Sequence, residues 1–130
     1  MPSTTTLYSL TALSAPVFAL GAGISLLRNQ QKRPFGTKDD PTDPLTKLVV
    51  AHRNATEYAG VLVPLILVVD ARCRGRAVDG IVIGAVVCRS LVIASLATCR
   101  SLTEVGIGRL VGAWGTYIFG GILAFLPLCF

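Results

Sequence analysis

The sequence predicts an all-α integral membrane protein built as a four-helix bundle. Apolar residues make up 52% of its 130 residues and charged residues only 15%, which is too apolar a composition for a soluble domain of this length. The apolar residues are gathered into four long runs, and most charged residues lie between the runs. We therefore expect one membrane domain covering residues 1–130, with a lipid bilayer as its surroundings.

The first predicted span, residues 7–27, contains 21 residues and no charge. At about 1.5 Å per residue, a helix of this length crosses a hydrocarbon core of roughly 30 Å. The following segment, residues 28–47, is polar and rich in proline and aspartate. We expect this segment to be the one long, irregular connection.

The second predicted span, residues 48–69, has two unlike halves. Its first half contains the polar stretch AHRNATEY, whereas its second half, AGVLVPLILVV, is wholly apolar. The third predicted span covers residues 78–99 and carries Asp79 near its start and Arg89 near its middle. Both helices are therefore expected to bury polar side chains at membrane depth.

The fourth predicted span, residues 105–128, carries small residues at four-residue intervals: Gly108, Gly112, Thr116 and Gly120. Small residues at this spacing allow the backbones of two membrane helices to approach closely. Gly80 and Gly84 repeat the spacing in the third span. We expect both stripes to lie at contacts between helices.

Charge in the connections predicts the orientation of the chain. The first and third connections carry six basic residues and the second carries three; the six are Arg28, Lys32, Arg33, Lys38, Lys47 and Arg100, and the three are Arg72, Arg74 and Arg76. Basic connections favour the cytoplasmic side. The long connection is then cytoplasmic, and both termini lie together on the opposite side.

The net charge of +5 is spread over these connections and does not form one cationic face, so nucleic-acid binding is disfavoured. The four cysteines and the single histidine show no spacing typical of a metal site. We therefore expect no metal, and we expect the cysteines to be reduced.

Five charged residues lie within the predicted spans: Arg53, Glu57, Asp79, Arg89 and Arg109. A charge at the centre of a membrane helix costs roughly 2.5–3.5 kcal/mol. Arg53 and Glu57 are four residues apart and can pair on one helix face, which alone would be a structural role. The arginines outnumber the carboxylates, however, and such a surplus inside the bundle favours binding of an anion.

The stretch AHRNATEYAGVLVP resembles the second helix of the MAPEG family, the membrane-associated proteins of eicosanoid and glutathione metabolism. That helix reads Arg-Ala-His/Gln-x-Asn-x-x-Glu before an apolar half with a proline; the residues in register here are Ala51, His52, Asn54, Glu57 and Tyr58. GIGRLVGAW is similar to the start of the family's fourth helix, whose arginine corresponds to Arg109.

The resemblance implies a four-helix bundle that forms a homotrimer and binds glutathione between neighbouring subunits. It implies that glutathione is held by Arg28, Arg53, Asn54, Glu57 and Tyr58. Arg109 would be the catalytic residue and would stabilise the glutathione thiolate. The activity implied is that of a glutathione transferase or peroxidase, with a lipophilic electrophile as the second substrate, entering from the bilayer.

Two departures from the family pattern keep other readings open. Val50 stands where the family has arginine, and the stretch after Arg89, SLVIASLATCRSL, lacks the histidine or tyrosine of the best-known enzymes. A non-catalytic member of the same fold is therefore an alternative. A small multidrug exporter is a weaker one, because such exporters use a carboxylate in the first helix and the first span here has none.

Overall fold

A computed structural model describes residues 1–129 of the chain, and this part is all-helical, without a strand. Four α-helices follow one another, and a short 3₁₀-helix closes the chain: α1 (Thr4–Gln30), α2 (Pro44–Arg72), α3 (Arg76–Thr98), α4 (Ile107–Phe125) and η1 (Leu126–Leu128). All four α-helices are long and apolar enough to cross a membrane, α4 together with η1. The prediction of an all-α four-helix bundle is thus confirmed, and the four helices are compatible with a multi-pass membrane protein.

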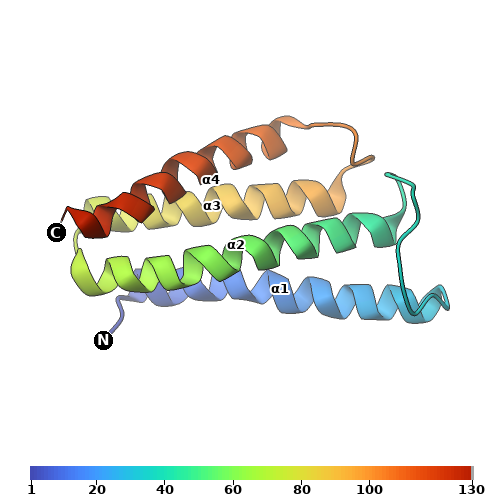
Figure 1. Ribbon diagram of the computed structural model, residues 1–130, viewed down its shortest axis with the longest axis horizontal. Helices are drawn as coiled ribbons and strands as arrows, with labels where there is room; N and C mark the ends of the chain where they lie inside the picture. Colours follow the sequence, from blue (N-terminus) through green and yellow to red (C-terminus); the bar gives the residue numbers. More distant parts are fainter. Residues whose placement is uncertain (130) are drawn as a thin grey trace.

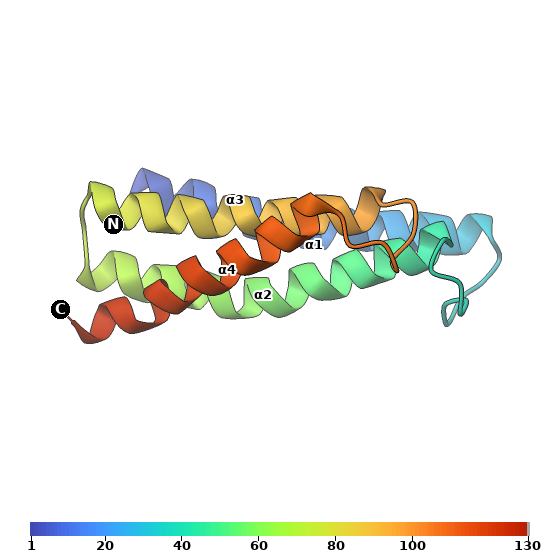
Figure 2. The same cartoon turned by 90° about the horizontal axis from the view of Figure 1, so that it is seen from above.

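The helices are arranged as two antiparallel pairs, with α1 against α2 and α4 along α3 (Figure 1). Contacts between α2 and α3 join the pairs, and α4 runs obliquely from α3 at its start toward α2 at its end (Figure 2). Both termini lie at one end of the bundle, and the connections 31–43 and 99–106 lie at the other (Figure 1). We call this second end the loop end.

The long connection is shorter than predicted, because α1 and α2 both extend into it. Helix α2 begins at Pro44, after Asp43, whose carboxylate accepts hydrogen bonds from the backbone N–H and the hydroxyl of Thr46 at 3.0 and 2.9 Å. Aspartate at the N-cap and proline at the first helical position are both strong helix starts. Residues 44–47, predicted as irregular, therefore form the first turn of α2.

The core has two parts. The larger part lies toward the termini and contains Leu13, Leu62, Ile66, Val69, Cys73, Val82, Ala85, Val86 and Leu123; the smaller part lies toward the loop end and contains Ala51, Val92 and Leu96. Many other large apolar side chains are exposed on the outside of the bundle, among them Phe18, Val87 and Ile118. An apolar outer surface is what contact with lipid requires.

Glycines of α4 make close contact with α3. A Cβ atom added at Gly112 would lie 2.6 Å from the carbonyl oxygen of Cys88, and one at Gly108 would lie 2.8 Å from the hydroxyl of Ser95. The predicted stripe is confirmed at these two positions. A Cβ at Gly84 would lie 2.8 Å from the Phe119 ring of α4, and one at Gly120 would lie 3.8 Å from Leu62 of α2, so both also lie at contacts between helices. Gly80 differs from the prediction, because it faces open space.

Candidate functional site

The polar first half of α2 turns its charged residues outward. Arg53 Nε donates to Glu57 Oε1 at 2.9 Å, and their side chains are 79% and 55% exposed in the single chain. Ala51 and Ala55 are the buried positions of this segment, so the residues two positions further along the helix point away from the other helices. The prediction that Arg53 and Glu57 lie inside the bundle is therefore wrong for the single chain, whereas their pairing is confirmed.

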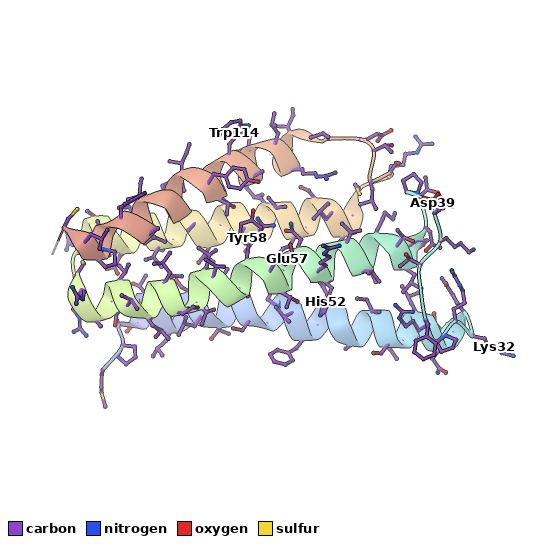
Figure 3. The ribbon with its side chains drawn as sticks, in the orientation of Figure 1. Lys32, Asp39, His52, Glu57, Tyr58 and Trp114 are labelled. Atoms are coloured by element: carbon purple, nitrogen blue, oxygen red, sulfur yellow. The ribbon has the colours of Figure 1, made fainter. Side chains whose placement is uncertain are left out.

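Asn54 and Tyr58 lie on the adjacent side of the same turn and are partly buried. The side-chain oxygen of Asn54 is buried, and no hydrogen-bond partner for it occurs among residues 1–129. Tyr58 lies on the side of α2 that faces α3 and α4 (Figure 3). This face of α2 thus combines an unsatisfied amide with an aromatic ring.

Arg89 of α3 is the one arginine enclosed within the described part of the bundle. It is 2% exposed, and its guanidinium carbon lies 3.8 Å from the centroid of the Tyr58 ring. A cation at this distance over an aromatic face is attracted by the ring. Its Nε and Nη2 atoms are buried without a hydrogen-bond partner in residues 1–129, so the ring is the main contact that offsets its charge.

Arg109 lies in the first turn of α4, at the loop end. Its Nη1 donates to the carbonyl oxygen of Leu102 at 2.9 Å, which ties the helix start to the preceding connection. Arg28, at the end of α1, is used in the same way: its Nη1 donates to the carbonyl oxygens of Pro34 and Gly36 at 3.4 and 3.0 Å. In the described residues these two arginines anchor connections and make no hydrogen bond or ion pair with the polar turn of α2.

Two apolar clefts flank the polar turn of α2. One, of about 230 Å³, lies between α2 and α4, with Tyr58 and Tyr117 in its wall and Gly120 and Gly121 at its base. The other, of about 320 Å³, lies between α1 and α2 and includes Thr56 and Phe18. Both are open at the outer surface of the bundle, so an apolar molecule could reach either from the bilayer.

No protein-family model, no curated protein and no solved structure matches this chain. Its function is therefore inferred from its residues and from their geometry.

The sequence counted Arg89 in the surplus of arginines expected to bind an anion but did not name it among the residues that hold glutathione. The structure makes it the partner of Tyr58, a residue that the sequence did propose for binding. The sequence already indicated that Arg89 has an interaction partner, because an arginine near the middle of an otherwise apolar helix needs one. The sequence could not supply that partner, since it does not show which face of α2 meets α3.

Titratable metal ligands do not cluster in the part of the chain that the structure describes. Cys73, Cys88, Cys99 and Cys129 are free thiols. The polar features of the bundle are thus guanidinium, amide, phenol and carboxylate groups, which recognise charged organic molecules through hydrogen bonds and ion pairs.

Proposed function

We propose that this chain is a MAPEG-like membrane protein that assembles as a homotrimer and uses glutathione to modify lipophilic electrophiles. In this proposal glutathione binds between subunits to Arg28, Arg53, Asn54, Glu57 and Tyr58, and Arg109 of a neighbouring subunit stabilises its thiolate. The observation that supports it best is the exposed ion pair between Arg53 and Glu57 at membrane depth.

The depth of this pair follows from helix geometry. Helix α2 has 29 residues and is about 44 Å long, so when it is centred on a hydrocarbon core of about 30 Å, Arg53 lies about 7 Å and Glu57 about 13 Å inside that core. Arg53 is directed to the deeper Glu57 and not toward the headgroups. A charge near the centre of a membrane helix costs roughly 2.5–3.5 kcal/mol, and pairing offsets this cost only where further hydrogen bonds satisfy the remaining donors and lone pairs.

An ion pair of this kind needs polar groups around it in place of lipid. A second copy of the chain with a bound anionic ligand would provide such groups. Glutathione has two carboxylates, an ammonium group and amides, which match guanidinium, carboxylate and amide side chains. Asn54, with its unsatisfied buried oxygen, is available to accept from an amide or ammonium of the ligand. Arg109 has further N–H donors beyond the one given to Leu102.

The chemistry requires a thiolate, because the thiolate and not the thiol is the nucleophile. A guanidinium close to the sulfur favours the charged form and lowers the thiol pKa of the ligand. In a transfer reaction the sulfur forms a bond to an electrophilic carbon, the leaving atom departs with the bonding electrons and then takes up a proton. The cleft between α2 and α4 is apolar and open to the outer surface, which suits a lipophilic electrophile beside Tyr58.

The test is glutathione binding to the protein purified in detergent, followed by calorimetry, with thiolate formation followed by its ultraviolet absorbance. We expect the wild-type protein to bind and to form the thiolate. Arg109→Ala should bind without forming the thiolate and should remain trimeric. Loss of the trimer in this variant would show that Arg109 is structural, and absence of binding to the wild-type protein at millimolar glutathione would overturn the proposal.

A non-catalytic protein of the same fold is the second candidate, and the hydrogen bonds of Arg28 and Arg109 to backbone carbonyls favour it. In that case the polar turn of α2 serves only to fix subunit register. The same binding experiment separates the two candidates, because only the enzyme requires glutathione. A small exporter ranks last: it would require proton-coupled transport that disappears in Glu57→Gln.

A further inference from the structure

The end of α1 forms a basic pocket in which Arg28, alone of the three cations, hydrogen-bonds through its side chain to the described residues, at Pro34 and Gly36. Its volume is about 260 Å³, and it is lined by Arg28, Asn29, Lys32, Arg33 and Pro34. We propose that this pocket binds the phosphate group of an anionic phospholipid. The proposal shares Arg28 with the glutathione site but does not depend on glutathione chemistry.

The side chains of Lys32 and Arg33 are not needed to cap α1, because backbone groups already do so. The N–H of Lys32 donates to the carbonyl of Asn29 at 3.2 Å, and the N–H of Arg33 donates to that of Arg28 at 3.0 Å. This pair of bonds is the Schellman motif, in which the orphan carbonyls of a helix end are satisfied by the backbone. The two basic side chains are therefore free to bind something else.

Lys32 occupies a position that normally belongs to glycine. Its φ is +51°, and it is the one residue other than glycine with a positive φ in the described part of the chain. A side chain in this left-handed region costs about 1–2 kcal/mol, and such strain is concentrated at functional positions. The retention of a long cation at this point favours a role for its ammonium group, which projects from the loop end of the bundle (Figure 3).

Arg33 lacks a partner for part of its guanidinium. Its Nη1 is buried, and residues 1–129 offer it no hydrogen bond. The nearby carboxylate of Asp43 has a lowered pKa, mainly because the Thr46 N–H donates to it, and the charges of Lys38 and Arg33 contribute less. Since Asp43 is engaged as the helix cap, it forms no ion pair with Arg33 in the structure.

The pocket lies at the depth of lipid headgroups. Helix α1 has 27 residues and is about 40 Å long, so it extends about 5 Å beyond each side of a 30 Å hydrocarbon core. Arg28 and the residues after it therefore reach the phosphate layer, and the exposed Leu26 lies just below, where an acyl chain begins. A phospholipid would contact both the basic pocket, through its phosphate, and the exposed Leu26, through its acyl chain. Free phosphate would contact only the basic pocket.

The experiment measures retained lipid by native mass spectrometry of the detergent-purified chain, without glutathione, with phosphatidylglycerol and phosphatidylcholine as probes. We expect phosphatidylglycerol to be retained preferentially. Lys32→Gln with Arg33→Gln should weaken its retention about 30-fold, equivalent to ~2 kcal/mol. The matched control, Lys38→Gln with Arg100→Gln, removes two charges from the same end outside the pocket and should change retention by less than about threefold.

Each other outcome overturns the proposal. Equal losses in the two double variants would mean unspecific attraction to a basic surface. Retention of phosphatidylcholine equal to that of phosphatidylglycerol would mean that the pocket does not recognise the negative charge of the headgroup. Displacement of the lipid by equimolar inorganic phosphate would mean that the pocket is a site for free anions. If the Gln variant unfolds, Lys32→Gly with Arg33→Gln removes the same charges and relieves the strained φ. Glutathione binding by this variant should be unchanged. Loss of lipid binding and loss of glutathione binding are therefore measured separately, so the lipid proposal can fail without the proposed enzyme function failing.

Discussion

Replacement of Arg89 by methionine should stabilise the bundle. The guanidinium is 2% exposed and lies 13 residues after the first residue of α3, about 14 Å from the nearer helix end. A charge at such depth costs roughly 2.5–3.5 kcal/mol, and stacking on Tyr58 at 3.8 Å returns about 2 kcal/mol in a desolvated site. Arg89→Met, which preserves length and packs flexibly, should therefore raise the free energy of unfolding by about 0.5–1.5 kcal/mol.

The assay is equilibrium unfolding of the detergent-purified protein in sodium dodecyl sulfate, followed by far-ultraviolet circular dichroism. Tyr58→Leu should destabilise the wild-type protein by about 2 kcal/mol more than it destabilises Arg89→Met, because only the wild-type protein has the cation to lose. Tyr58→Phe retains the ring face and serves as the control. A coupling near zero, or a loss of more than about 1 kcal/mol in Arg89→Met, would refute the reasoning and would indicate that Arg89 is held by a structural anion.

Three further changes test the fold by the same unfolding assay. Gly112→Ala should lower stability by about 1–3 kcal/mol because its Cβ would lie 2.6 Å from a carbonyl oxygen of α3, whereas Gly121→Ala, with open space, should not. Lys32→Gly should raise stability by about 1 kcal/mol, since the φ of +51° suits glycine. Asp43→Ala should lower it by about 1 kcal/mol. The Thr46 N–H lowers the pKa of Asp43, so the contribution of this carboxylate is complete above about pH 4 and is lost as pH falls through the lowered pKa.

The four spans could be predicted because bilayer thickness sets the length of each apolar run. The start of α2 at Pro44 was also readable, since Asp43 and Pro44 are an ordinary helix-start pair. The end of α1 could not be predicted, because the residue with left-handed backbone geometry that follows the helix is Lys32. Glycine is the usual residue at that position. The end of α1 is thus settled by local backbone geometry that residue type does not reveal.

The partners of the charged residues could not be predicted, because the rotation of a helix about its axis depends on what packs against it. The sequence grouped Arg53, Glu57, Arg89 and Arg109 as one internal cluster. In the structure Ala51 and Ala55 occupy the inward face of α2, which turns the first two of these residues outward. Arg89 alone remains enclosed, and Arg109 lies in the first turn of α4.

Position along the helix axis separates the cations into two groups with different partners. Toward the ends of the bundle several of them donate to backbone carbonyls, as Arg28 does to Gly36 and Lys47 to Cys99. At depth their partners are side chains from one turn of α2, since Arg53 pairs with Glu57 and Arg89 stacks on Tyr58. The terminal cations satisfy carbonyls that would otherwise be left at the edge of the bilayer, so the loss of one of them should affect the fold first. The deep cations satisfy no backbone group and carry a desolvation cost, so the reason for their presence is to be sought in what binds beside the polar turn of α2.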